Sequence, residues 1–168
     1  GRMNDVSKDE MVELIKIHEE EYLLYKHTPL NVTLIRGSYA DENGNITAKD
    51  EGVILENLIA AMATKRYGGK VIAQVKGIVK AGTIPPKEVD VPGVLVDVIV
   101  VCENPMEDHR QTSSWFQDDT YSGQLWAPES AIAPAPLTER KAIVRRALMQ
   151  IYPDIIMNIG TGIPTDVM

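Results

Sequence analysis

The feature that most restricts the fold is a pair of β-rich segments that come shortly after a segment with helical periodicity. Residues 70–82, KVIAQVKGIVKAG, alternate in polarity as a strand does. Residues 92–101, PGVLVDVIVV, form a nearly continuous apolar run, typical of a parallel strand covered on both faces. Residues 52–67 predict a helix that Gly68 and Gly69 end, since apolar side chains recur there at helical spacing: Leu55, Leu58, Ile59, Met62 and Ala63.

A further strand-like stretch precedes this helix. It is TPLNVTLIRGSYA, residues 28–40, and it leads into ADENGNI, where Asn43 and Gly44 predict a turn because both tolerate positive φ. The order strand, helix, strand, strand with short connections predicts the α/β class, with a layered, mainly parallel sheet and flanking helices.

The N-terminal stretch fits two patterns. Ser7 and Glu10 form a capping box, and Met11, Leu14 and Ile15 would share one face of a helix. The following EEEYLLYK also suits a strand. We therefore predict a short helix from Ser7 and a strand after it.

The chain is predicted to contain two α/β segments joined by a connection. Residues 1–102 form the first and residues 103–137 the connection, which lacks periodicity and is rich in proline, serine and acidic residues. Residues 138–168 begin the second, with a helix capped by Thr138 and then PDIIM as a buried strand.

A glycine turn, MNIGTGIP, follows that expected strand. Such a turn lets backbone N–H groups converge on an anion or on a carbonyl oxygen that gains charge. The pair Gly160 and Gly162 lacks the third glycine of a dinucleotide fingerprint and the Gly-Lys-Ser/Thr of a P-loop. The final TDVM would begin a helix too short to stand alone, so we expect the sequence to be cut from a longer protein.

Charge and composition narrow the classes of function. The net charge of −7 argues against a nucleic-acid partner, whose binding depends on Lys and Arg. No apolar run approaches the roughly 18–20 residues of a membrane span. The single cysteine, Cys102, excludes an internal disulfide, and three scattered histidines suggest no metal site. A cytoplasmic protein that binds neither membrane nor nucleic acid is expected.

Other polar groups have a structural and a functional interpretation. Asp41 and Glu42 could face a cation, but their spacing does not match an EF-hand and favours a structural turn. Cys102 and His109 could pair as nucleophile and base, yet no third partner is visible.

The remaining candidates also favour structural roles. Gln74 needs a partner if its strand is buried, and the charges at 139–146 suit a solvated helix face, although a basic cluster could meet a phosphate. Four aromatic residues in the connection would anchor it to the core rather than line a pocket: Trp115, Phe116, Tyr121 and Trp126.

Three segments together resemble the family I coenzyme A transferases, in particular the fused propionate and acetate (acyl-CoA:acetate/3-ketoacid) type. They are LIRGSYADENGNIT, GGKVIAQVKGIVKAGTIPPKEVDVPGVLVDVIVV and LTERKAIVRRALMQIYPDIIMNIGTGIP, in the family's order. The resemblance implies two related α/β domains in the parent protein, both incomplete here, with this chain spanning the end of the first, the linker and the start of the second.

The resemblance also implies a mechanism. Coenzyme A passes from a short-chain acyl-CoA to a carboxylic acid in a ping-pong reaction through a glutamyl-CoA thioester. The attacking glutamate is expected in a Ser-Glu-Asn-Gly-like motif beyond Met168, so this chain alone should be inactive and no glutamate in it is assigned that role. The match to the family's turn places Gly160, Gly162, Ile163 and Pro164 at the acyl pocket, with backbone amides near the thioester carbonyl. Thr161 departs from the aliphatic residue usual there.

The family resemblance further implies the partners. They are acyl-CoA and small carboxylic acids, the rest of the polypeptide and further copies in a homo-oligomer, with coenzyme A as substrate and no separate cofactor. Two alternatives remain: a sugar-phosphate isomerase or deaminase of the same fold group, and a non-catalytic ligand-binding relative.

Overall fold

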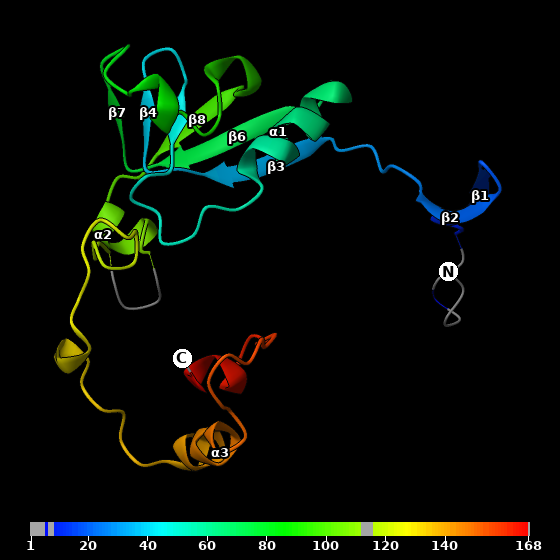
Figure 1. The fold of residues 1–168 in the computed structure, drawn as a ribbon. Helices are drawn as coiled ribbons and strands as arrows, with labels where there is room; N and C mark the ends of the chain where they lie inside the picture. Colours follow the sequence, from blue (N-terminus) through cyan, green and yellow to red (C-terminus); the bar gives the residue numbers. More distant parts are fainter. Residues whose placement is uncertain (1–5, 7–8, 112–115, 168) are drawn as a thin grey trace. The chain divides into compact units, whose positions relative to one another are not determined.

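A computed structural model of the chain describes residues 6, 9–111 and 116–167. It contains two compact units, residues 1–125 and residues 126–168. Every strand that the structure describes belongs to the first unit, and the second contains a helix and short 3₁₀ segments (Figure 1).

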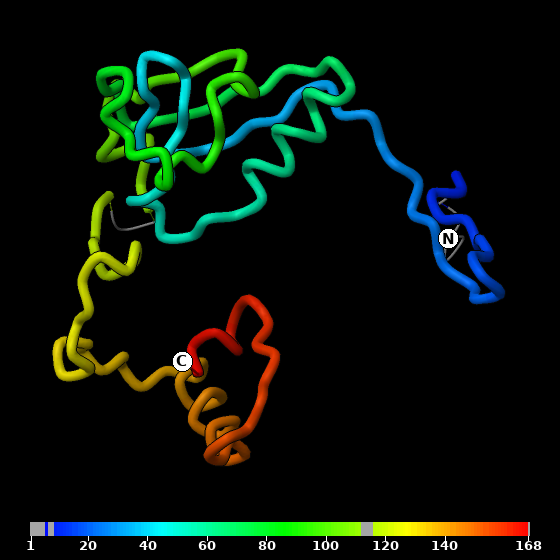
Figure 2. Tube along the Cα trace, turned by 45° about the horizontal axis from the view of Figure 1, so that its top comes forward, coloured from blue at the N-terminus to red at the C-terminus, as the bar shows by residue number. Residues whose placement is uncertain are grey.

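A parallel sheet forms the centre of the first unit. Its order is β3 (Val32–Arg36), β6 (Lys70–Val75) and β8 (Val98–Val101), with parallel pairing on both sides of β6. Helix α1 (Asn57–Arg66) directly precedes β6 in the chain and packs beside both β3 and β6 (Figure 2). The predicted α/β class and the parallel pairing are therefore confirmed.

A second small sheet continues from the first. Strand β4 (Tyr39–Asp41) pairs in parallel with β7 (Gly77–Val79) and antiparallel with β5 (Ile46–Thr47). Backbone hydrogen bonds also join the segments between the two sheets: the Gly37 N–H donates to the Gln74 carbonyl, and the Lys76 N–H donates to the Ser38 carbonyl. Gly37 is required at this bend, since a Cβ there would collide with the Ile46 side chain.

The core lies between α1 and one face of the sheets. Its buried residues are Ile35, Ala40, Ile46, Ala61, Val71, Ala73, Val75 and Val91. The alternate side chains of the parallel sheet face the other way and are exposed, including Val32, Leu34, Val98 and Val100. The expectation that residues 92–101 form a strand covered on both faces is therefore wrong for this chain: the strand begins at Val98, after the 3₁₀ helix η2 (Gly93–Leu95), and remains half exposed.

The N-terminal prediction is also corrected. Residues 12–25 form an antiparallel hairpin of β1 (Val12–Ile17) and β2 (Glu20–Tyr25), where we expected a helix from Ser7. His18 and Glu19 adopt positive φ at the two-residue turn, as tight hairpin turns of this kind require. Strand β1, whose residues include Val12, Ile15 and Ile17 with high β-propensity, pairs with β2, which lies in the segment where a strand was predicted.

Helix α1 begins at Asn57, five residues later than expected at 52, and residues 52–56 form no regular structure. Gly68, at φ +70, follows its end as predicted. The other short helices of this unit are η1 (Pro86–Glu88) and α2 (Pro105–Asp108).

In the second unit, η3 (Glu129–Ala131) precedes α3 (Glu139–Leu148). Thr138 caps α3 as predicted, because its side chain accepts a hydrogen bond from the Lys141 N–H. The predicted strand at PDIIM, residues 153–157, is absent: residues 153–154 form a turn, residues 155–157 are irregular and Ile156 is 98% exposed. A strand needs a neighbour to receive its hydrogen bonds, and the described part of this unit contains none. The chain continues into η4 (Ile163–Val167).

Candidate functional site

The glycine turn lies between the irregular segment and η4, and the structure gives its two glycines different roles. Gly162 has φ +115, a conformation that favours glycine. Gly160 has no such constraint, and a Cβ at either position would meet nothing within 4 Å. Pro164 lines a hollow of about 290 Å³. Its other lining residues are mainly apolar: Ala147, Ile151, Ile155, Met157, Ile159 and Val167, with Gln150 and Asn158.

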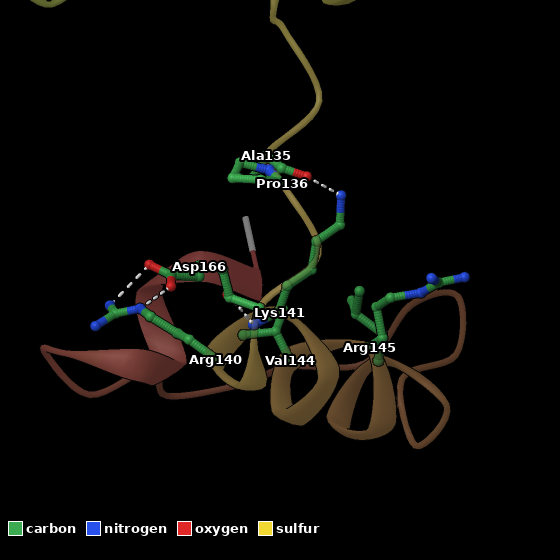
Figure 3. Close-up of a pocket in the computed structure, with 9 residues that line it drawn as sticks. Ala135, Pro136, Arg140, Lys141, Val144, Arg145 and Asp166 are labelled. Carbon is green, nitrogen blue, oxygen red and sulfur yellow. Dashed lines mark hydrogen bonds and ion pairs between the residues drawn. The ribbon is translucent and has the colours of Figure 1, made fainter.

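One side chain of α3 forms hydrogen bonds with this turn and with the η4 segment after it. Arg140 donates to both carboxylate oxygens of Asp166, from Nε to Oδ2 and from Nη2 to Oδ1 (Figure 3). The same Nη2 lies 3.0 Å from the Gly162 carbonyl oxygen. The hydrogen bond from Arg140 lowers the pKa of Asp166, and the same contact raises the pKa of Arg140.

Sequence reasoning missed the role of Arg140. We interpreted the charges at 139–146 as a solvated helix face, and nothing in the sequence predicts that Arg140 pairs with Asp166, 26 positions further along the chain. Helix α3 also borders a hollow of about 310 Å³, with Lys141, Val144 and Arg145 among its lining residues (Figure 3). Lys141 donates to the Ala135 carbonyl there.

The first unit contains a second polar centre at the carboxyl edge of its parallel sheet, the edge where open α/β sheets commonly bind ligands. Glu51 is its hub. Its carboxylate lies 2.9 Å from Arg36 Nε, 2.9 Å from His109 Nε2 and 3.2 Å from the Ser38 hydroxyl. Burial acts to raise the pKa of Glu51, but the hydrogen bond with His109 and the charge of Arg36 outweigh it, and the pKa is lowered.

Cys102 and His109 do come together at this centre. Cys102 Sγ lies 3.6 Å from His109 Nδ1, and the Gln74 side-chain amide donates to the same sulfur at 3.2 Å. Glu51 supplies the third partner that the sequence did not reveal, 58 positions from His109. Because Cys102 and His109 are both buried, these contacts fit the structural interpretation of the pair.

A neighbouring ion pair extends this polar centre. Lys76 Nζ lies 2.8 Å from Asp50 Oδ2, and the Lys76 side chain is only 7% exposed. Its ammonium group lies over the rings of Tyr39 and Phe116, at 4.9 Å and 5.8 Å from their centroids. Gln111 donates to the Asp50 carbonyl at 2.6 Å, which attaches the start of the connection to the sheet edge.

The prediction that the aromatic residues anchor the connection holds for some of these residues and not for others. Phe116 contacts Lys76, and Tyr121 lies near Gly52, in line with anchoring. Trp126 is 94% exposed, so the anchoring prediction is wrong for that residue, which has no core beside it. Trp115 lies outside the described residues.

Asp41 confirms the structural interpretation of its turn. Its Oδ1 accepts from the backbone N–H groups of Asn43 and Asn45, at 2.9 Å each, while Glu42 pairs with Lys80. Across the described residues, no group of three or more histidine, cysteine or acidic side chains is arranged to hold a metal ion. No helix in the same part of the chain is long and apolar enough to cross a membrane.

Comparison with known proteins identifies the family. Residues 3–102 match the family described as Coenzyme A transferase, and the chain belongs to that family. It is 46% identical to the caffeate CoA-transferase of Acetobacterium woodii over 167 residues, covering 99% of this chain and 32% of the relative. It is 35% identical to the acetate CoA-transferase YdiF of Escherichia coli K12 over 164 residues, covering 97% of this chain and 30% of the relative.

Solved structures agree with this assignment. The acyl-CoA transferase YdiF of Escherichia coli O157:H7 superimposes as apoenzyme with a TM-score of 0.73 and 32% identity, over 98% of this chain and 30% of that one. Its thioester complex with CoA has the same TM-score and identity, over 98% of this chain and 32% of that one. The chain thus spans about a third of the length of these relatives.

Proposed function

We propose that the protein containing this chain transfers coenzyme A between an acyl-CoA and a carboxylic acid. The observation that carries the proposal is the 46% identity to a caffeate CoA-transferase across 99% of the chain. A relative that is 32% identical over 98% of this chain was solved as a thioester complex with CoA, which supports the same chemistry.

The reaction implied by the family has two balanced halves. A glutamate carboxylate attacks the acyl-CoA carbonyl, the C–S bond breaks, and CoA leaves as a thiolate. The thiolate attacks the glutamyl carbonyl of the resulting anhydride, which releases the first acid and leaves a glutamyl-CoA thioester. In the second half the same steps run in reverse: the acceptor carboxylate attacks the glutamyl-CoA thioester and releases CoA as a thiolate. The thiolate then attacks the acceptor acyl carbonyl of the new anhydride, which forms the new acyl-CoA and releases the glutamate carboxylate. We place the attacking glutamate outside residues 1–168.

In this proposal the second unit contributes main-chain donors to the reaction. The turn at Gly160, Gly162, Ile163 and Pro164 would border the acyl group, with an amide near the oxygen that gains charge in each tetrahedral intermediate. The open space around the glycines and the apolar hollow beside Pro164 support this placement. The first unit would supply a rigid frame, since Glu51 and Asp50 bind residues from several segments of it.

The domain limits follow from the same proposal. Residues 1–102 would be the C-terminal part of the first transferase domain, residues 103–137 the connection, and residues 138–168 the start of the second domain. The family match over residues 3–102 supports the first limit.

The assembly and location are also proposed. The whole protein would form homo-oligomers in the cytoplasm. The exposed apolar face of the parallel sheet supports burial against further polypeptide, and the free thiol of Cys102 fits a reducing compartment.

Steady-state kinetics of the full-length protein test the proposed reaction. Acetyl-CoA and an aromatic enoyl-CoA would serve as donors, each against several acceptor acids. A ping-pong transferase gives parallel double-reciprocal lines when donor and acceptor are varied. Intersecting lines, or no exchange with any pair, would contradict the proposal.

A further inference from the structure

We propose that Arg140 is a positioning residue for the glycine turn: it fixes the orientation of the Gly162–Ile163 peptide and thereby aims the Ile163 N–H. This inference rests on the proposed function, because the aimed donor matters only if a thioester oxygen lies beside it.

The Gly162 carbonyl oxygen is held from two sides. Arg140 Nη2 donates to it at 3.0 Å from helix α3. Thr165 donates to it twice, from its hydroxyl at 2.6 Å and from its backbone N–H at 3.1 Å. A carbonyl oxygen with these donors cannot rotate without losing them.

The orientation of the carbonyl fixes the N–H of the same peptide. In a trans peptide the C=O and the N–H point in opposite directions, so the Ile163 N–H points away from Arg140. No acceptor for this N–H is found among the described residues. This orientation of the peptide goes with a φ of +115 at Gly162, which glycine adopts without the strain that a Cβ would cause.

Arg140 is well placed to act as a rigid support. It lies in the first turn of α3, where the Thr138 side chain accepts from the Lys141 N–H and the Thr138 carbonyl from the Ala142 N–H. Asp166 holds the guanidinium in a two-point contact, which restricts the plane of the group as well as its position.

The exposure of the contact argues against a role in stability. The side chains of Arg140 and Asp166 are 51% and 40% exposed, and ion pairs exposed to this degree contribute little to folding. The expected effect of losing the contact is therefore on the geometry of the turn.

The test uses the full-length protein and two readouts. Single-turnover formation of the enzyme–CoA thioester gives an amplitude, which reports the active fraction, and a rate, which reports positioning. Hydrogen exchange of peptides covering residues 160–167 reports the turn independently of activity. The variants are Arg140→Gln and Arg140→Lys, with Arg145→Gln as a control that removes one positive charge from the same helix.

Arg140→Gln should retain the amplitude, lose about tenfold or more in rate and leave KM for acyl-CoA within about twofold. Exchange at residues 160–167 should accelerate. Arg140→Lys should be intermediate, because it retains one donor, and Arg145→Gln should match the wild type in both readouts.

Three results would overturn the inference. Unchanged exchange in Arg140→Gln would show that the arginine does not hold the turn. Faster exchange at an unchanged rate, or a loss confined to the amplitude, would show that it holds the turn without positioning the reaction. A wild-type protein that forms no thioester would refute the proposed function and the positioning role with it, while the exchange data would still report whether the contact exists.

Discussion

At the scale of single residues, the sequence identified several participants of the buried polar centre but not their partners. Gln74, Cys102 and His109 stood out as polar groups in or after strands, and the structure joins all three. Glu51 and Arg36 did not stand out, because acidic and basic residues are common on surfaces and their contacts span 58 and 15 positions. Only the parallel order of β3, β6 and β8 brings these segments to one edge.

Removal of the Glu51 carboxylate should weaken the first unit. Glu51→Ala is expected to lower the free energy of unfolding by about 2 kcal/mol, since it removes the carboxylate that pairs with Arg36 Nε and with the buried His109. Urea unfolding of the full-length protein measures the change. Glu56→Gln, at an exposed carboxylate next to α1, should unfold like the wild type, and equal stability of the two variants would show that Glu51 is not a hub.

The two glycines of the turn should respond differently to alanine. Gly162→Ala should cost about 1–2 kcal/mol in stability, because its φ of +115 is strained for any residue with a Cβ. Gly160→Ala should leave unfolding unchanged, since its Cβ meets open space, yet lower kcat/KM if the acyl group occupies that space. Thermal unfolding and transfer kinetics measured on the same preparations compare them. A greater loss of stability in Gly160→Ala would contradict this account.

At the scale of elements, periodicity succeeded where one strong pattern governed a segment. Strands β3, β6 and β8, helix α1 and helix α3 all lie within predicted segments. The N-terminal hairpin was missed because a capping box and a β-rich run competed in one stretch, and pairing with β2 favoured the strand. The strand expected at PDIIM failed for the opposite reason: its composition suits a strand, but no neighbouring strand is described in its unit.

One carboxylate links α1, β6 and the start of β8, and it should make the fold sensitive to acid. Asp97 accepts from the Val71 backbone N–H, from Lys65 and from Lys70. These hydrogen bonds, with that from Val71 largest, hold the pKa of Asp97 well below its usual range. A lowered pKa means that its stabilisation is present above the ordinary aspartate pKa and is lost as the pH falls through the lowered value.

Asp97→Asn should therefore be less stable than the wild type at pH 7, and the difference should shrink as the pH falls through the acid range. Thermal unfolding from pH 7 to pH 2 measures it. Glu103→Gln, at an exposed carboxylate, should keep the wild-type pH dependence. A constant gap between wild type and Asp97→Asn at all pH values would contradict the assigned role.

At the scale of the whole molecule, fold and family agree, while the proposed chemistry requires a glutamate that we place outside this chain. The chain spans about a third of its relatives' length, and its exposed sheet face and open glycine turn are surfaces that further polypeptide and substrate could cover. The sequence predicted the family because segments along nearly the whole chain resemble it and occur in the family's order. The contacts that shape the turn could be identified only from the structure.

The central claim is that this turn serves a reaction whose nucleophile lies elsewhere in the protein. Mass mapping of the full-length protein after incubation with acyl-CoA and no acceptor tests it most directly. The account predicts one coenzyme A adduct on a glutamate outside residues 1–168, reversed by adding a carboxylic acid. An adduct on a residue within 1–168, or no adduct at all, would contradict it.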